Sequence, residues 1–241
     1  MKKIILCIAA AISAAGVFAQ NSSDLLKEIE DKVITGEEKV KQKKEKEWKV
    51  FDGSILCSYG YGYHTVQNAD FTPVPKRCRE YFITLGEIRY SPAEPIALTA
   101  GVDIRWDSFE TVSESFSVGA DNQVSIAPAA TGADRSFSEI RLTSLAAPLR
   151  IRANLGVISL QAGVDLIYRY RRDVLNTSIT GNMTNETRWK KVGAKTLDWN
   201  ISTAVEVFGL GFYYRFSPES IFPEGGMNLK FHTVGLYYSL F

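Results

Sequence analysis

The sequence is poor in the residues that build metal, redox and catalytic sites. Its 241 residues include two histidines, three cysteines and three methionines. It contains no Cys-x-x-Cys motif, no His-x-x-His motif and no cluster of four carboxylates. We therefore expect neither a dedicated metal site nor a bound cofactor.

The sequence also lacks a strong charge and, beyond its first residues, a long apolar run. There are 28 Lys and Arg residues against 27 Asp and Glu residues, a formal net charge of +1. This balance gives no reason to expect a polyanionic partner such as nucleic acid. No later segment approaches the roughly 18 apolar residues of a membrane helix. If the protein crosses a membrane, it must do so as a closed β-barrel, because only helices and barrels satisfy all backbone hydrogen bonds in lipid.

Residues 1–19 have the pattern of a secretory signal peptide. Two lysines precede an apolar run, which ends in small residues before Gln20. Its removal takes away two lysines and no acid, and leaves 26 basic and 27 acidic residues, a net charge of −1. Residues 20–49 are rich in Lys and Glu and poor in aromatic residues. We interpret them as a charged periplasmic tail, with room for a short amphipathic helix; a partner-binding or plug helix is the alternative.

From about residue 50 onward, apolar and polar residues alternate with period two, as in β-strands with two different faces. In residues 96–106 and 158–170, one face is almost wholly apolar and the other carries Asp and Arg. About eight strands are predicted, at 50–63, 80–90, 96–107, 137–152, 157–170, 197–207, 209–217 and 229–241. Long polar connectors alternate with tight turns. The prediction is an all-β fold over residues 50–241, an eight-stranded antiparallel up-and-down transmembrane β-barrel.

Alternation alone does not decide which face of the barrel is inside. A soluble lipocalin-like carrier would turn its apolar face inward. Aromatic residues near the strand ends, among them Trp106 and Tyr170, favour a membrane barrel, because such rings suit the headgroup level. The alternating loop lengths and the absence of a Gly-x-Trp motif near the first strand point the same way. The lipocalin-like carrier remains an alternative.

Three segments carry a resemblance to a known family. They are residues 147–152 with 156–170, residues 209–216, and residues 234–241, which end on Phe241. Together they resemble the small bacterial outer-membrane β-barrel superfamily, which includes OmpX, OmpW and PorT-like proteins. The resemblance covers roughly residues 50–241 and implies location in the outer membrane of a Gram-negative cell. It also implies that the final Phe241 strand is recognised by the barrel-insertion machinery.

The polar face of the predicted strands carries the charges expected to line the lumen. The members of this predicted lumen charge network are Asp103, Arg105, Glu139, Arg141, Asp165, Arg169, Asp198, Glu206 and Arg215. Glu87 and Arg89 are expected to join them across a bulge. Arginine pairs carboxylates in a bidentate manner, and eight strands enclose only enough space for side chains. We therefore expect a plugged, salt-bridged lumen with a structural role; a channel for small solutes is the alternative.

Enzymatic activity is not expected. Some small outer-membrane barrels modify lipid with a histidine, a serine and a carboxylate, which makes His232 with Thr233, or His64 with a loop serine, the candidates. Neither histidine belongs to a His-x-Ser pair, and a general base needs a positioned nucleophile. The long loops are expected to be polar, with a protein partner at these loops as the functional alternative. We expect a monomer in contact with outer-membrane lipid, and leave the pairing of Cys57 and Cys78 open.

Overall fold

The computed structural model describes residues 51–54, 58–67, 71–93, 95–112, 114–129 and 132–239. The predicted signal peptide, the charged tail and Phe241 lie outside these ranges. Within them, no helix is long and apolar enough to cross a membrane.

The described chain is almost entirely β-structure. Its strands are β1 (Phe51–Ser54), β2 (Ser58–Gln67), β3 (Arg79–Ala93), β4 (Ile96–Thr111), β5 (Glu114–Val118), β6 (Val124–Pro128), β7 (Arg135–Leu155), β8 (Ile158–Thr180), β9 (Met183–Lys190), β10 (Leu197–Val207), β11 (Leu210–Phe216) and β12 (Lys230–Ser239). A single 3₁₀ turn, η1 (Pro75–Arg77), precedes β3 in the described part.

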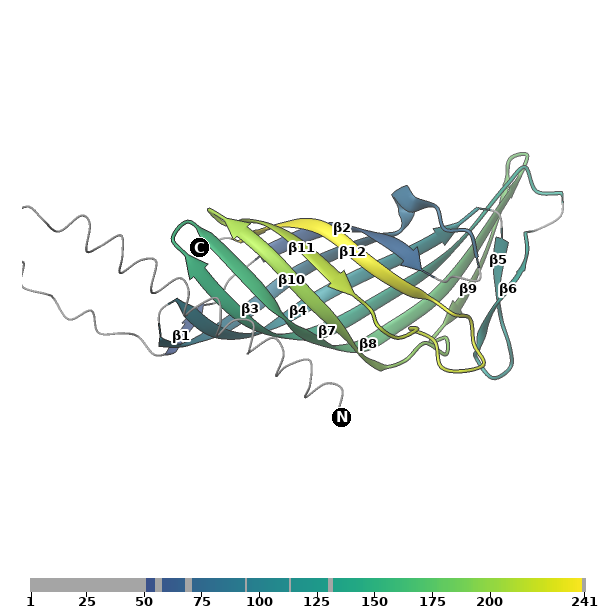
Figure 1. Cartoon of the computed structure of the whole chain (residues 1–241). Helices are drawn as coiled ribbons and strands as arrows, with labels where there is room; N and C mark the ends of the chain where they lie inside the picture. The colour runs from purple at the N-terminus through teal and green to yellow at the C-terminus, as the bar shows by residue number, and fades with distance from the viewer. Residues whose placement is uncertain are drawn as a thin grey trace, which may run out of the picture.

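Eight of the described strands close into a ring, shown side-on in Figure 1. Going around it, the order is β2, β3, β4, β7, β8, β10, β11 and β12, and β12 pairs with β2 again. Every pairing is antiparallel. β2 pairs with residues 79–84 of β3, and β1 pairs with residues 87–90 of the same strand. The predicted eight-stranded antiparallel barrel is confirmed.

The two ends of the barrel differ as predicted. At one end, β7–β8 and β10–β11 are joined by two-residue turns, with positive φ at Gly156 (71°), Phe208 (51°) and Gly209 (81°). The other end carries the long connections between β2 and β3, β4 and β7, β8 and β10, and β11 and β12. We call these the short-turn end and the long-loop end.

β7 and β8 are far longer than the wall requires. They contain 21 and 23 residues, whereas about 9–11 residues cross a bilayer. Their excess length projects beyond the long-loop end together with β9 (Figure 1, right). The hairpin β5–β6 lies beside this protruding sheet. The sequence predicted shorter strands and polar loops here, and the structure corrects that prediction.

The wall is apolar outside and polar inside. On β4, Leu98 and Val102 are 47% and 46% exposed, whereas Asp103 and Arg105 are 0% and 1% exposed. The same inversion runs around the ring, with Leu166, Phe212 and Leu236 about half exposed. The outer surface also carries exposed aromatic side chains, including Tyr63, Tyr168 and Tyr170.

The long-loop end has a hydrophobic core of its own, which we call the cap. Its buried members come from all four long connections and the adjoining strands: Phe71, Cys78, Phe109, Phe116, Val124, Ile140, Leu142, Val174, Val192, Ala194, Ile221, Phe222, Met227, Leu229 and Phe231. Backbone hydrogen bonds tie the connections together, for example from Gly193 to Asn122 and from Met227 to Val124. The long connections therefore form a packed lid.

Candidate functional site

The middle of the lumen holds a cluster of three carboxylates and three guanidinium groups. Asp165 on β8 accepts hydrogen bonds from Arg105 (2.8 Å), Arg150 (3.4 Å) and Ser202 (2.9 Å). The guanidinium of Arg215 lies 3.3 Å from the same carboxylate. Asp165 is fully buried, so its charge is compensated by these neighbours and not by water.

The other two carboxylates of the cluster come from β3 and β4. Asp103 accepts hydrogen bonds from Arg105 (2.9 Å) and Thr84 (2.8 Å). Glu80 pairs with Arg215 and accepts a hydrogen bond from the Tyr213 hydroxyl at 3.0 Å. Five strands thus meet in one ionic cluster across the barrel axis.

Aromatic rings fill the space beside this cluster. The Arg215 guanidinium lies 4.4 Å from the ring centroid of Phe82 and 4.6 Å from that of Tyr213. The rings pass close over glycines: a Cβ on Gly60 would lie 2.0 Å from Phe82, and one on Gly211 would lie 2.0 Å from Tyr237. Glycine is required at these positions because a larger residue would displace the rings.

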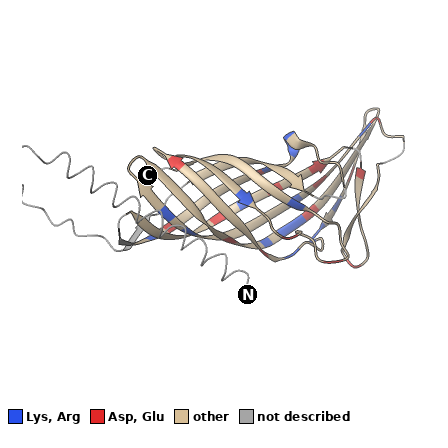
Figure 2. Cartoon of the chain, viewed as in Figure 1, with Lys and Arg blue, Asp and Glu red and all other residues tan. Residues whose placement is uncertain are grey.

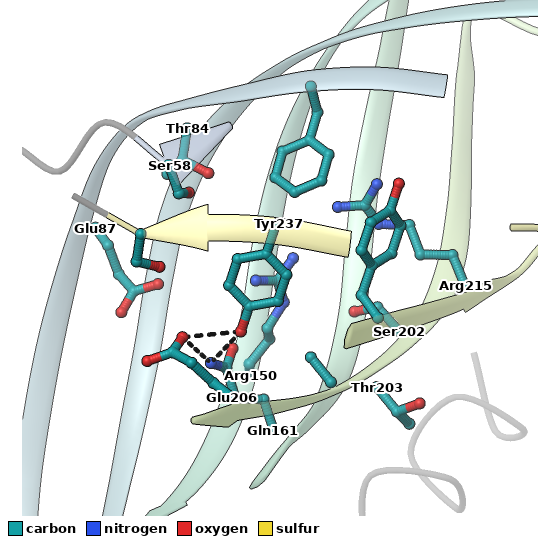
Figure 3. A pocket seen from close by; sticks show the side chains of 14 residues that line it. Ser58, Thr84, Glu87, Arg150, Gln161, Ser202, Thr203, Glu206, Arg215 and Tyr237 are labelled. Atoms are coloured by element: carbon teal, nitrogen blue, oxygen red, sulfur yellow. Dashed lines mark hydrogen bonds between the residues drawn. The ribbon is translucent and has the colours of Figure 1, made fainter. Parts of the chain in front are cut away.

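A second polar group lies nearer the short-turn end. Glu206 pairs with Arg152 (2.6 Å) and accepts a hydrogen bond from the Tyr237 hydroxyl (2.9 Å). Gln161 donates to both Glu206 (3.4 Å) and Tyr237 (3.2 Å), as the dashed lines in Figure 3 show. The cavity between this group and the central cluster measures about 30 Å³. That volume suits a water molecule or two and excludes a larger solute.

Toward the long-loop end, the network continues to the underside of the cap. Arg169 pairs with Asp198 at 2.8 Å. His64 lies between Asp107 (3.3 Å) and Thr233 (2.9 Å), with its ring stacked on Phe109 of the cap at 4.6 Å. Base, carboxylate and hydroxyl are therefore adjacent, but Thr233 is fully buried, so a substrate cannot reach its hydroxyl.

Seven of the nine predicted network residues face the lumen, and two do not. Glu139 and Arg141 pair with each other at 2.6 Å on the outside of the wall, where the Arg141 side chain is 49% exposed. Ile140 and Leu142, which alternate with them, point into the cap. The prediction was wrong for this pair because β7 keeps one phase along its length: residues with even numbers, including Arg150, face inward.

The lumen charges on β8 depend on a bulge. Ser144 pairs with Arg169 and Thr143 with Arg171, so Tyr170 is an extra residue in β8. As a result Arg169 points inward, whereas Arg171 is half exposed on the outside. Figure 2 shows basic residues in blue and acidic residues in red along the strands, from the middle of the barrel to its protruding end. The bulge predicted near Glu87 is also present, between Thr84 and Gly86.

Sequence reasoning missed Glu80, Tyr213 and Tyr237. Glu80 lies two residues from Phe82, and both side chains face the lumen. Because Phe82 is apolar, the sequence of β3 does not show a regular polar face there. The two tyrosines lie in aromatic runs on β11 and β12, where neighbours on both faces are apolar. The sequence offered one indirect sign of large lumen side chains, which is the presence of glycines such as Gly60 and Gly211 at positions that the rings of Phe82 and Tyr237 cover.

The closed ring has apolar side chains on its outer surface and ionised side chains inside. This is the reverse of a soluble barrel, whose apolar side chains face inward. The chain therefore folds as a small eight-stranded β-barrel with its apolar face outward. No family model matches its sequence, and no curated protein matches it. Similar solved structures include Ail of Yersinia pestis, with the heparin analogue sucrose octasulfate (10% identity, TM-score 0.38, covering 77% of this chain and 97% of Ail) and without it (11%, 0.37, 77% and 97%). A mutant porin of Rh. blastica is also similar (12%, 0.22, 78% and 100%).

The protruding sheet of this barrel has one covered edge and one free edge. On the side of β4, Pro73 bridges to Thr111 and Val74 donates to the carbonyl of Glu110, so the preceding loop covers that edge. On the other side, β9 pairs only with β8 among the described residues, and seven of its eight residues are exposed. An unpaired strand edge of this length is a template for pairing with another chain.

Two titratable groups of the long-loop end have shifted pKa values. Burial in the cap raises the pKa of the Cys78 thiol, which is free; Cys57 lies outside the described residues. The hydrogen bond and the charge of Lys195 lower the pKa of Glu219, 2.8 Å away. The contact between Lys195 and Glu219 links the β8–β10 connection to the β11–β12 connection.

Proposed function

We propose that this protein is a bacterial outer-membrane barrel that serves as a surface interaction module and has no catalytic centre. The closed, ion-paired lumen makes the barrel a rigid anchor. The protruding sheet presents the free edge of β9 to a protein partner, which would pair with it by strand addition. The observation that carries this proposal is the combination of a sealed barrel with one uncovered edge at the long-loop end.

Membrane residence predicts two results. The mature chain is expected to fractionate with the outer membrane, and its folded form to migrate differently from the boiled form on a gel. The physical reason is that the apolar belt is soluble only in lipid or detergent. Recovery of a folded, detergent-free monomer from the soluble fraction would contradict the proposal and favour the carrier alternative.

The hairpin geometry identifies which β9 groups face a partner. Gly181 and Asn182 form a two-residue turn, so Thr180 and Met183 make a hydrogen-bonded pair. Hydrogen-bonded and non-hydrogen-bonded residue pairs then alternate along the hairpin. The backbone N–H groups of residues 184, 186 and 188, which belong to non-hydrogen-bonded pairs, therefore point to the free edge. Proline at such a position removes an edge donor without breaking the pairing with β8.

We therefore expect Glu186→Pro to abolish strand addition. Extended peptides selected for binding to the folded barrel should lose most of their affinity for this variant, and bound peptide should slow hydrogen exchange at residues 184 and 188. Glu186→Ala is the matched control, because it removes the same side chain and keeps the N–H donor. Equal loss in both variants would show that the side chain, and not the strand edge, is recognised.

A further inference from the structure

The free edge of β9 carries its charged side chains on one face of the protruding sheet. Glu186, Arg188 and Lys190 are all exposed, and they are spaced two residues apart. Alternate residues of a strand point to the same face. A strand that adds to β9 would therefore bring every second one of its side chains beside these charges.

The three charges differ in their compensation within the chain. Arg188 pairs with Asp173 of β8, whose buried carboxylate also binds Arg171 at 2.8 Å. Lys190 is the register partner of Asp173, but neither Lys190 nor Glu186 forms an ion pair with any described residue. Two charges of opposite sign therefore remain uncompensated on this edge.

The sign of the charge changes along the edge. Near the wall, the one carboxylate of Asp173 is outnumbered by three bases, which are the two arginines that bind it and Lys190. Glu186 lies four residues closer to the hairpin tip, about 13 Å along the strand. Arg135 is on the same face near the tip, but it belongs to β7, two strand spacings or about 10 Å from β9. An added strand thus meets positive charge beside Lys190 and negative charge beside Glu186.

The backbone of the edge would hold partner side chains directly beside both charges. The N–H groups of even-numbered residues of β9 point to the free edge. In an antiparallel partner, the residues opposite Glu186 and Lys190 would form hydrogen-bonded pairs with them, with Cα atoms about 5.5 Å apart. Directly opposed side chains point to the same face, so opposite charges at these positions attract each other and like charges repel.

The other face of the edge adds an apolar position. Trp189 points to the face opposite Lys190, and its partly buried ring packs against the cap. In an antiparallel partner, the residue opposite Trp189 would belong to a non-hydrogen-bonded pair, in which the Cα atoms are about 4.5 Å apart and the side chains are closer. An apolar side chain at this position would cover the remaining exposed part of the indole.

We infer that the partner strand of β9 runs antiparallel to it and carries an acidic residue opposite Lys190, an apolar residue opposite Trp189 and a basic residue opposite Glu186. Along the partner chain, the order is acid, apolar, any residue, any residue, base. A parallel strand would need the base before the acid, so the order of the charges also fixes the direction of the strand. The inference names the kind of partner for the edge proposed above and rests on that proposed function.

The experiment compares two extended peptides of identical composition. One contains the order Asp-Val-Thr-Thr-Lys and the other the order Lys-Val-Thr-Thr-Asp, between the same threonine flanks. Their binding to the refolded full chain in detergent micelles is measured by fluorescence polarisation. One variant, Glu186→Lys with Lys190→Glu, exchanges the two charges of the edge. The matched control, Glu186→Gln with Lys190→Gln, removes both charges and keeps the backbone donors. Heat-modifiable migration verifies that each variant has folded.

The wild type is expected to bind the acid-first peptide about tenfold more tightly than the base-first peptide, because two favourable cross-strand charge pairs are replaced by two unfavourable ones. The exchanged variant should reverse this preference, and the neutral control should bind both peptides equally. Since the charges are exposed, about 1 M salt should remove the preference of the wild type. A nitroxide at the N-terminus of the acid-first peptide should broaden the amide resonance of Lys190 more strongly than that of Thr184, as an antiparallel strand requires.

Equal binding of the two peptides by the wild type, or an unchanged preference in the exchanged variant, overturns the inference and leaves strand addition intact. Stronger broadening at Thr184 also overturns it, because the strand would then be parallel. The proposed function is tested separately by Glu186→Pro, which should lose the binding of both peptides. Undiminished binding by Glu186→Pro, or a wild type that binds neither peptide, contradicts the proposed function and the inference with it.

Discussion

Asp165→Asn is expected to destabilise the barrel by about 3–5 kcal/mol, the range for removing one partner from a buried ion pair. The carboxylate is fully buried and lies within 3.4 Å of Arg105, Arg150 and Arg215. Without it, three guanidinium groups share the two remaining carboxylates of the cluster, and two of them, Arg105 and Arg215, are almost completely buried. Urea-induced unfolding in detergent micelles, followed by tryptophan fluorescence, measures the change.

Two further variants make this prediction specific. Arg141→Gln breaks an ion pair whose Arg side chain is half exposed, and it is expected to cost less than about 1 kcal/mol. Asp165→Asn combined with Arg150→Gln restores the charge balance of the cluster, and should be less destabilised than Asp165→Asn alone. If Asp165→Asn costs no more than Arg141→Gln, the lumen cluster does not hold the barrel together.

Phe109→Ala is expected to weaken the cap by about 3–5 kcal/mol, the usual cost of deleting a buried phenylalanine. The Phe109 ring is fully buried between His64 (4.6 Å) and Phe231 (4.9 Å). Because these contacts lie at the long-loop end, the loss should be local. Hydrogen exchange at the amides of Gly193 and Met227, which bond to β6 and its turn, should accelerate by about a hundredfold or more.

The wall of the Phe109→Ala variant should keep its slow exchange and its heat-modifiable migration, since its ion pairs are untouched. Val112→Ala serves as the control, because Val112 lies beyond the end of β4 and is 49% exposed, so its truncation should change stability by less than about 0.5 kcal/mol. Unchanged exchange in the cap of Phe109→Ala would show that the long connections do not depend on their shared core.

The sequence predicted the wall well because period-two alternation is a local signal. On β4 it placed Asp103 and Arg105 on the face opposite Val102, and in the structure these two charged side chains are buried whereas Val102 is exposed. It put Glu139 and Arg141 in the lumen, but β7 keeps one phase along its length, so these odd-numbered residues lie on the face opposite Arg150. Register between strands decides such cases, and register is a property of the paired strands together.

The cap was beyond local reasoning for a different reason. Phe71, Phe116, Ile221 and Leu229 are scattered over three connections, and each connection taken alone is mostly polar. Their apolar side chains meet only once the ring has brought the loops to one end. The same holds for Asp165, whose three guanidinium partners come from three other strands.

The amino-acid sequence by itself determined the barrel and its strand count, because these follow from the alternation of neighbouring residues along the chain. The tertiary structure alone decided which charges meet in the lumen, that the long connections share a core, and that β9 has a free edge. Those features depend on closure of the ring, which brings together side chains that are far apart in the chain.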